Sequence, residues 1–265
     1  MRIGMAQLLV EGGEPERSFE RAEKLIRAGK KEGCDLILLP ETIDFAWTHP
    51  SSLHEAKTIP GVYSDFFCKL ASDINIWLCL GLTEKRADKN YNTALLIDAT
   101  GNIVLKYSKI NLLEVEFPFY EVGQKLEVVD TPFGKMGVNI CADNYIDSVY
   151  NGFLLARMGA QIILSPSSWT VDHFVTEEMD PYKTKWIDPL SLIAEKYKIP
   201  ILSTTSVGYI VGGPYEGKKM VGCSLAVDET GVLAQGEFNE FASDLKVVDV
   251  QIKQPTKKGT QFAEL

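Results

Sequence analysis

A glutamate, a lysine and a cysteine each follow an apolar or strand-like stretch of this sequence, and together they could perform acyl transfer. Glu41 ends the apolar run 34–41, Lys109 follows a predicted hairpin, and Cys141 ends the small and apolar stretch 135–141. A carboxylate beside a thiol can take its proton and later activate a water molecule. A nearby ammonium lowers the pKa of the thiol and stabilises a tetrahedral oxyanion.

Each of these residues also has a purely structural interpretation. Free cysteine is among the most buried residue types, so Cys141 taken alone is better explained as part of the core. Glu41 could cap a helix, and Lys109 could be a solvated surface charge. The elements that carry the three residues decide whether their side chains meet.

The apolar pattern predicts elements that would bring the three positions to one edge of a sheet. Amphipathic stretches at helical spacing alternate with short apolar runs, which is typical of an α/β fold. Open α/β sheets place their sites at the carboxyl ends of strands, where Glu41 stands. We predict helices over 15–31, 61–75, 149–159 and 180–198, the last interrupted near Pro189. We predict strands over 3–10, 34–41, 76–83, 91–98, 102–107, near 128, and over 135–141, 160–164, 200–207, 220–227, 232–236 and 245–252.

Composition predicts one soluble, acidic domain over residues 1–265. Of these 265 residues 45% are hydrophobic and 24% are charged, and the net charge is −9. An acidic chain without a basic run longer than a lysine pair is not expected to bind nucleic acid. No apolar run approaches a membrane span, and the first residues show no signal-peptide pattern. The five cysteines form no CxxC pair, which favours reduced thiols in the cytoplasm over a disulfide or zinc framework.

Three motifs resemble the signature motifs of the nitrilase, or carbon–nitrogen hydrolase, superfamily. They are Leu-Leu-Pro-Glu at 38–41, Lys-Tyr-Ser-Lys-Ile-Asn-Leu at 106–112 and Gly-Val-Asn-Ile-Cys-Ala-Asp at 137–143. The resemblance extends from Arg2 to about Val250. Because three ordered motifs are far more specific than any single one, they outweigh the interpretation of Cys141 as an inert core residue.

The resemblance implies a four-layer αββα sandwich, an α/β fold of two mixed β-sheets flanked by helices. It implies Glu41 as general base, Lys109 as the stabiliser of the transition state and Cys141 as nucleophile. It also implies a homodimer formed by helices that pack across a two-fold axis. No cofactor and no metal are expected.

A second glutamate usually follows the lysine in this superfamily, seven residues before a glycine that opens the next strand. Glu116 precedes Gly123 by seven residues. We therefore assign this second carboxylate to Glu116 rather than to Glu114 or Glu121.

The sequence departs from the superfamily pattern at three positions near the site. Ala142 stands where an aromatic residue usually follows the nucleophile. Ser148, seven residues after Cys141, stands where a glutamate is frequent, and Asn111, two residues after Lys109, stands where a histidine is common. These changes alter the pocket wall, so the resemblance does not identify the substrate. Aromatic candidates for the wall, for which core packing is an equal alternative, are Phe45, Trp47, Phe119, Tyr145 and Trp169, and we predict substrate contacts from Trp47, Ala142, Tyr145 and Trp169.

The predicted function is hydrolysis of a non-peptide C–N bond in a small amide or N-carbamoyl compound through a thioester on Cys141. Nitrile hydrolysis is less favoured, because nitrilases of the superfamily are usually longer than 265 residues. The alternative is a catalytically silent relative that binds a small metabolite or a protein partner. The changed residues Ala142 and Ser148 favour that alternative, whereas the retained Glu41, Lys109 and Cys141 oppose it.

Three other signals are set aside. The glycines and lysines of 212–219 resemble a phosphate loop, but Lys219 stands where a serine or threonine is needed and a strand follows. His49 and His54 have no third ligand nearby, so a metal site is not predicted. A Cys-His hydrolase would have to use His173, and it lacks the glycine-flanked nucleophile elbow, since Asn139 and Asp143 occupy those positions.

Overall fold

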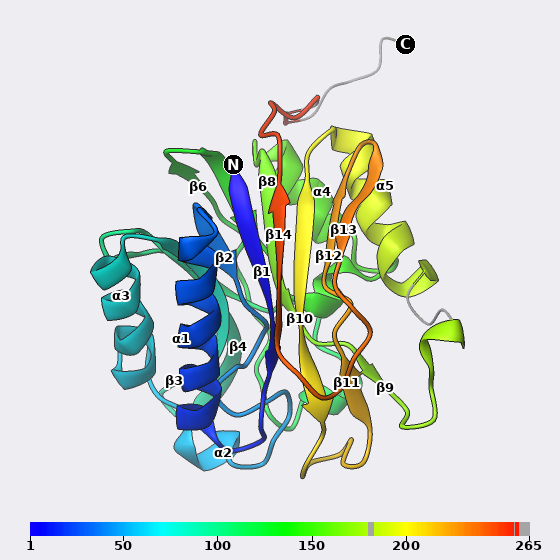
Figure 1. Cartoon of the computed structure of the whole chain (residues 1–265). Helices are drawn as coiled ribbons and strands as arrows, with labels where there is room; N and C mark the ends of the chain where they lie inside the picture. Colours follow the sequence, from blue (N-terminus) through cyan, green and yellow to red (C-terminus); the bar gives the residue numbers. More distant parts are fainter. Residues whose placement is uncertain (180–182, 257, 260–265) are drawn as a thin grey trace.

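The computed structural model describes residues 1–179, 183–256 and 258–259. Two layers of strands lie face to face, with helices on both outer sides (Figure 1). The first layer has the strand order β5-β4-β3-β2-β1, and the last strand of the chain pairs antiparallel with β1. Its strands are β1 (Arg2–Leu9), β2 (Leu36–Leu38), β3 (Trp77–Arg86), β4 (Lys89–Ile97), β5 (Ile103–Ser108) and β14 (Asp244–Asp249).

The second layer has the order β10-β8-β7-β6, and a hairpin pairs with the start of β10. In both layers parallel strands form the centre and antiparallel strands the edges, so the predicted mixed sheets are confirmed. The layers are joined because the ends of β1 and β10 pair at Leu8 and Ser206. The strands are β6 (Val128–Thr131), β7 (Gly134–Val138), β8 (Ile162–Ser167), β9 (Thr170–Val171), β10 (Ile201–Tyr209), β11 (Lys219–Val221), β12 (Leu225–Asp228) and β13 (Gly231–Gln235).

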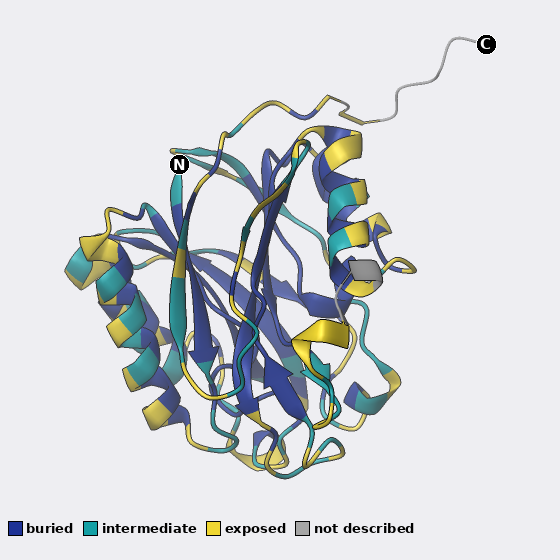
Figure 2. Ribbon diagram, turned by 45° about the vertical axis from the view of Figure 1, so that its right-hand side comes forward, coloured by how far each residue is buried: buried dark blue, intermediate teal, exposed yellow. Residues whose placement is uncertain are grey.

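Three apolar clusters confirm the predicted order of helix, sheet, sheet and helix. The central cluster joins side chains of both sheets, for example Leu38 and Leu164. A second cluster packs α1 (Pro15–Lys31) and α3 (Val62–Ile74) on the first sheet, and a third packs α4 (Tyr150–Arg157) and α5 (Asp188–Tyr197) on the second. Figure 2 shows the central strands buried and the outer faces of the helices exposed.

Helix α1 spans the residues that periodicity predicts and lies close to the sheet. Its Gly29 faces Ile37 of β2, and a β-carbon there would lie 2.3 Å from Ile37 Cδ1. The short helix α2 (Ser52–Glu55) lies in the loop after β2. None of the helices in the described residues is both long and apolar enough to span a membrane.

Two predicted elements are broken or begin differently in the structure. The predicted strand 220–227 breaks into β11 and β12, because Gly222 and Cys223 both adopt left-handed backbone conformations, with φ of 70° and 60°. The break lets β11 pair with the end of β10 while β12 pairs with its start. The predicted helix 180–198 begins instead as a π-helical turn, Lys183–Ile187, and Pro189 lies in the first turn of α5 rather than interrupting a helix; residues 180–182 lie outside the described part.

Candidate active site

The ends of β2, β5 and β7 bring Glu41, Lys109 and Cys141 into one buried cluster. Strand β2 is shorter than predicted and ends at Leu38, so Glu41 lies in the loop beyond it. Gly81 of β3 allows the close approach of that loop, since a β-carbon at Gly81 would lie 2.4 Å from Glu41 Cα. The three side chains are only 1–4% exposed. The arrangement therefore excludes bulk water from the groups that would react.

Lys109 directly follows β5 and extends its ammonium to two carboxylates. Its Nζ lies 2.9 Å from both oxygens of Glu116 and 3.5 Å from Glu41 Oε2. Burial alone would lower the pKa of Lys109, but the two carboxylates outweigh burial and hold that pKa well above its usual value. Lys109 is therefore a fixed cation inside the site.

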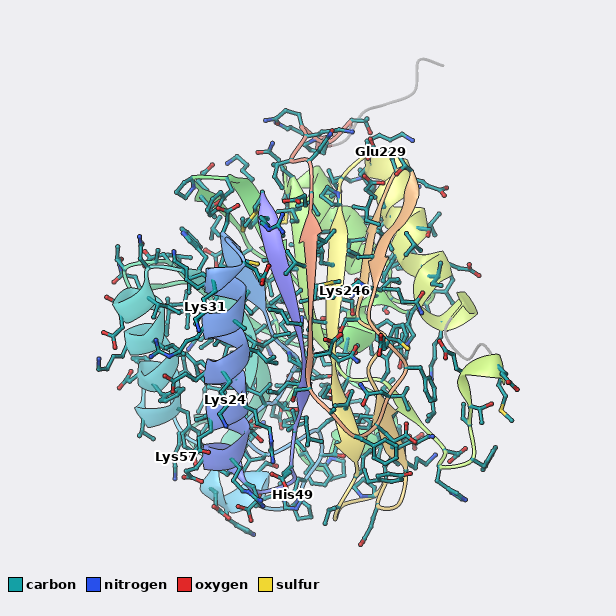
Figure 3. The ribbon with its side chains drawn as sticks, viewed as in Figure 1. Lys24, Lys31, His49, Lys57, Glu229 and Lys246 are labelled. Carbon is teal, nitrogen blue, oxygen red and sulfur yellow. The ribbon has the colours of Figure 1, made fainter. Side chains whose placement is uncertain are left out.

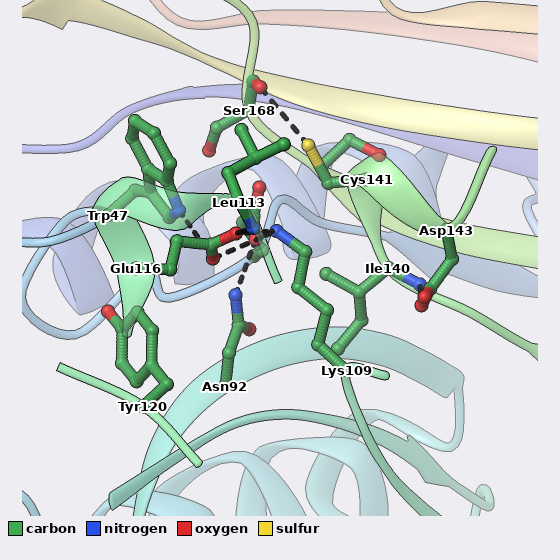
Figure 4. Close-up of polar contacts among 12 residues, drawn as sticks. Trp47, Asn92, Lys109, Leu113, Glu116, Tyr120, Ile140, Cys141, Asp143 and Ser168 are labelled. Atoms are coloured by element: carbon green, nitrogen blue, oxygen red, sulfur yellow. Dashed lines mark hydrogen bonds and ion pairs between the residues drawn. The ribbon is translucent and has the colours of Figure 1, made fainter. Parts of the chain in front are cut away.

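Glu116 is the carboxylate that holds Lys109 in place. It lies in a 3-10 turn, Glu114–Glu116, and accepts hydrogen bonds from Trp47 Nε1 at 2.7 Å and the Leu113 backbone N–H at 2.8 Å. In Figure 4 the side chains of Trp47 and Lys109 both point toward Glu116. Glu121, in contrast, forms a surface ion pair with Lys89. The structure thus places the glutamate chosen by spacing, and not its neighbour Glu121, against the lysine.

Gly123 explains why the spacing is informative. Its backbone N–H donates to the carbonyl of Lys109 at 2.8 Å, which fixes the loop against the end of β5. A β-carbon at Gly123 would lie 1.9 Å from the Ser108 carbonyl oxygen, so no larger residue fits. The glycine therefore closes the loop that carries Glu116.

Glu41 has one engaged and one open carboxylate oxygen. Asn92 Nδ2 donates to Oε2 at 2.6 Å, whereas Oε1 is buried and has no well-formed hydrogen bond within the described residues. Burial raises the pKa of the Glu41 carboxyl, and the positive charge of Lys109 opposes this shift. A carboxylate with an open oxygen and a raised pKa is suited to accept a proton.

Cys141 opens a 3-10 turn, Cys141–Asn144, in a conformation that non-glycine residues rarely adopt, with φ of 44°. Its Sγ donates to the Ser168 carbonyl at 3.4 Å. Burial and the Glu41 carboxylate raise the pKa of the Cys141 thiol, and the opposing effect of Lys109 is smaller. The lowering of the thiol pKa that the sequence analysis expects from a nearby ammonium is therefore present, but burial and the Glu41 carboxylate outweigh it.

A third buried carboxylate of the site, Asp143, ties the turn Cys141–Asn144 to the loop after Lys109. It accepts hydrogen bonds from the hydroxyl of Tyr107 at 2.6 Å and the backbone N–H of Ile140 at 2.9 Å. Both the backbone and the side-chain amide of Asn111 also donate to it, at 2.9 and 2.7 Å. Asn111, which replaces a common histidine, thus has a positioning role. Sequence reasoning missed Asp143, although it stands in the third motif.

A cavity of about 320 Å³ opens beside Cys141. Three of the four predicted substrate-binding residues, Trp47, Tyr145 and Trp169, line it. Ala142 is buried outside the lining, and its carbonyl accepts a hydrogen bond from Ser148. Trp186, which the sequence did not single out, stacks on Trp169 with 4.1 Å between ring centroids. The lining residues are Trp47, Leu113, Cys141, Tyr145, Ser168, Trp169, Thr170, Val171, Asp172, Val175, Lys185, Trp186, Tyr215 and Lys218.

The other two aromatic candidates, Phe45 and Phe119, do not line this cavity. Phe45 is fully buried, and Phe119 packs against the small apolar cluster that contains Trp47 and Tyr120. A larger hollow of about 900 Å³ lies over β5 and contains none of the four predicted catalytic residues. Within the ranges that the structure describes, His, Cys, Asp and Glu side chains form no group of three or more that could hold a metal ion.

Sequence comparison places these features in a known context. A sequence model described as carbon-nitrogen hydrolase matches residues 2–257. A nitrilase from Pyrococcus abyssi is 28% identical over 226 residues, which cover 83% of this chain and 80% of the relative. A deaminated glutathione amidase from Dictyostelium discoideum is 26% identical over 274 residues, which cover 95% of this chain and 88% of the relative.

Solved structures with the same fold include two hydrolases. A carbon-nitrogen hydrolase from Helicobacter pylori G27 has a TM-score of 0.81 at 23% sequence identity, over 94% of this chain and 89% of that chain. A mutant amidase from Nesterenkonia sp. AN1, with acrylamide added at its active-site cysteine, has a TM-score of 0.78 at 20% identity, over 95% of this chain and 93% of that chain. These likenesses establish the fold.

Proposed function

The chain belongs to the carbon–nitrogen hydrolase family and is a hydrolase that acts on C–N bonds, and on this basis we propose that it cleaves a small amide or N-carbamoyl compound through a thioester on Cys141. One observation carries this proposal. The thiol, a fixed ammonium and an open carboxylate oxygen lie in a single water-excluding cluster beside a cavity. Amidases among the relatives and among the solved structures support the amide as the bond that is cleaved.

The first half of the reaction forms the thioester. Glu41 takes the proton of the Cys141 thiol, and the sulfur attacks the carbonyl carbon, so that the carbonyl oxygen becomes negative. Lys109 stabilises this oxyanion. When the intermediate collapses, the C–N bond breaks and the proton on Glu41 passes to the leaving nitrogen, which departs as ammonia or an amine.

The second half of the reaction returns the enzyme to its starting state. A water molecule gives a proton to Glu41 and attacks the thioester carbon, and Lys109 again stabilises the oxyanion. Collapse breaks the C–S bond, the proton on Glu41 returns to sulfur, and the acid product leaves. Glu116 does not exchange a proton in this scheme, because both of its oxygens already face Lys109.

We also propose that the chain forms a homodimer through α4. Tyr150, Leu154 and Met158 repeat at intervals of four residues and are 68%, 49% and 49% exposed, so they form an apolar stripe on the outside of the molecule. A two-fold axis along this helix would bury the stripe against its copy. All five cysteines are free thiols, which fits the cytoplasmic location that we propose.

The proposed function is tested by incubating the protein with a panel of small amides and N-carbamoyl compounds and measuring the ammonia that is released. We expect at least one substrate to be hydrolysed by the wild type and none by Cys141→Ala. Hydrolysis of the panel by Cys141→Ala at the wild-type rate would exclude the mechanism. Failure of the wild type on the whole panel, with an intact fold, would favour a catalytically silent relative.

A further inference from the structure

We propose that Asp44 is a positioning residue for the reaction: its buried carboxylate holds the loop 41–48 on β3 and so fixes the general base Glu41 beside Cys141. This inference rests on the proposed function, because it needs Glu41 to act as the base. Asp44 is not among the residues that line the cavity, so it acts through Glu41 rather than on the substrate.

The loop 41–48 carries a site residue near each end. Glu41 opens it, and Trp47, which lines the cavity and donates to Glu116, lies near its close. The residues of the loop with left-handed backbone conformations are Thr42, Ala46 and Thr48, with φ of 45°, 66° and 60°. Non-glycine residues persist in such conformations only where the surrounding structure imposes them. The path of this loop therefore depends on the contacts that hold it.

Asp44 supplies a side-chain contact from the middle of the loop to the sheet. It is completely buried, and its Oδ2 accepts the backbone N–H of Thr83 at 2.8 Å. Its Oδ1 accepts the backbone N–H of Phe45 at 3.0 Å and the hydroxyl of Thr83 at 3.3 Å. Since Thr83 belongs to β3, the carboxylate joins the loop to that strand.

The strand residue that Asp44 contacts also belongs to the support of the base. Thr83 lies opposite Asn92 in the antiparallel pair of β3 and β4. The side chain of Asn92 donates to Glu41, and its carbonyl accepts the backbone N–H of Lys109 at 2.9 Å. One cross-strand pair therefore holds the loop at Asp44, the base at Glu41 and the end of β5 at Lys109. Release of Asp44 would free the loop from this pair and let the Glu41 carboxylate move within the site.

Stability alone does not explain why this contact is made by a carboxylate. Burial raises the pKa of the Asp44 carboxyl from 3.8 to about 7, although the backbone N–H groups of Thr83 and Phe45 oppose the shift. The unfolded chain therefore releases this proton at a lower pH than the folded chain does. As a result, Asp44 makes folding less favourable as the pH rises from 3.8 to about 7. A neutral side chain would not carry this cost.

The titratable groups next to Asp44 are two phenols. Tyr63 of α3 and Tyr120, in the loop after the turn Glu114–Glu116, both feel the Asp44 charge. Burial raises the pKa of both phenols, that of Tyr63 to about 12, so both stay uncharged near pH 7. A proton exchanged near neutral pH in this cluster therefore belongs to Asp44.

The end of the loop is held independently of Asp44. The backbone N–H of Thr48 donates to the Tyr120 hydroxyl at 3.3 Å. The next residue, His49, lies so close to Gly12 that a β-carbon there would lie 2.7 Å from His49 Cδ2. Figure 3 shows His49 near the lower end of the molecule. Replacement of Asp44 should therefore loosen the loop near Glu41 without detaching it.

The test compares Asp44→Asn with the wild type by two rates. One is the rate at which iodoacetamide alkylates Cys141, located by peptide mapping, and the other is kcat for the amide that the wild type hydrolyses fastest. Asparagine keeps the size of the side chain but has only one accepting oxygen, so one backbone hydrogen bond is lost. We expect both rates to fall roughly tenfold to a hundredfold, since a displacement of about 1 Å can cost about 10²-fold.

Thermal unfolding separates this role from a purely structural one. The melting temperature of Asp44→Asn, relative to that of the wild type, should rise as the pH increases from 3.8 to about 7, because only the wild type then buries a charge. Asp98→Asn is the matched control. Asp98 also accepts backbone N–H groups, from Thr100 and Asn102 at 2.8 and 2.9 Å, but on an exposed turn, so both rates should stay unchanged.

A second variant covers the case in which Asp44→Asn does not fold. Thr83→Val removes only the hydroxyl that donates to Asp44 and should lower both rates by about twofold to tenfold, as expected for one weak hydrogen bond. Unchanged rates in Thr83→Val would then overturn the inference.

The outcomes distinguish this inference from the proposed function. Wild-type rates in Asp44→Asn, or a loss of rate accompanied by a lower relative melting temperature at every pH, would overturn the role of Asp44 and leave the proposed function intact. Slower alkylation of Cys141 in Asp44→Asn, together with a wild type that hydrolyses no amide, would support the role of Asp44 and count against the proposed function.

Discussion

Lys109 Nζ lies 2.9 Å from each carboxylate oxygen of Glu116, and both side chains are completely buried. Such a pair is costly to break, because removing one partner leaves the other as an uncompensated buried charge. In the proposed mechanism, the same contact holds the ammonium that stabilises the oxyanion formed at Cys141. Glu116 therefore both positions Lys109 and balances its charge. The first prediction removes the ammonium itself, and the second removes only the charge of the carboxylate that holds it.

Lys109→Met should abolish turnover, because loss of a positioned oxyanion donor removes roughly 3–4 kcal/mol of transition-state stabilisation. It should also lower the melting temperature, since Glu116 and Glu41 lose their shared cation. Steady-state kinetics and thermal unfolding measure both effects. Lys89→Met is the matched control, because Lys89 forms only an exposed ion pair with Glu121. Substantial turnover by Lys109→Met would show that another group stabilises the oxyanion.

Glu116→Gln should have a milder effect than Lys109→Met. The amide oxygen can still accept one hydrogen bond from Lys109, but the charge pair is lost, so we expect a decrease in kcat of about 10²-fold. Glu121→Gln should behave as the wild type, since Glu121 lies on the surface beside Lys89. The opposite result, an inactive Glu121→Gln and an active Glu116→Gln, would contradict the assignment of the second glutamate.

In a plot of kcat/KM against pH, the fall on the acidic side should occur at a higher pH than the usual pKa of a glutamate, because burial raises the pKa of Glu41. The general base must be ionised, so kcat/KM should fall as the pH drops through this raised pKa and the carboxylate takes up a proton. Asn92→Ala removes a hydrogen bond that lowers the pKa of Glu41. The acidic fall should therefore move to higher pH in Asn92→Ala and stay in place in Asn102→Ala, an exposed control on the turn between β4 and β5. If the acidic fall in kcat/KM occurs at the same pH in Asn92→Ala as in the wild type, the group that titrates is not Glu41.

Sedimentation of the wild type should give a mass near twice 29.5 kDa, the mass of one chain. Leu154→Glu places a charge in the apolar stripe of α4 and should shift the equilibrium to the monomer. Val62→Glu, at a 63% exposed position of α3, should leave the mass unchanged. Sedimentation of the wild type as a single monomeric species at micromolar concentration would contradict the proposed homodimer.

Much of the site could be predicted because its residues lie at the ends of strands that local sequence patterns define. Glu41, Lys109 and Cys141 follow apolar stretches, and the structure brings all three together. Glu116 could be chosen because the superfamily resemblance implies a glutamate seven residues before a glycine, and the structure shows why Gly123 must be a glycine, since no larger residue fits against the Ser108 carbonyl oxygen. In these cases the local pattern and the tertiary contact agree.

Other parts of the site depend on contacts that no local pattern encodes. Asn92 reaches Glu41 from the adjacent hairpin, and Lys185 and Trp186 lie in a π-helical turn without a periodic signal. The net pKa shift of Cys141 could not be foreseen either, because it depends on how burial and the Glu41 charge compare with Lys109. The break between β11 and β12 follows from two left-handed residues, only one of which is a glycine.

Intact-protein mass spectrometry during turnover tests the central claim most directly. Enzyme quenched in acid while it hydrolyses an amide should carry the mass of one acyl group, and peptide mapping should place that group on Cys141. Cys141→Ala, treated in the same way, should show neither the added mass nor turnover. Steady turnover without an acyl adduct, or an adduct on one of the other four cysteines, Cys34, Cys68, Cys79 or Cys223, would contradict the thioester mechanism.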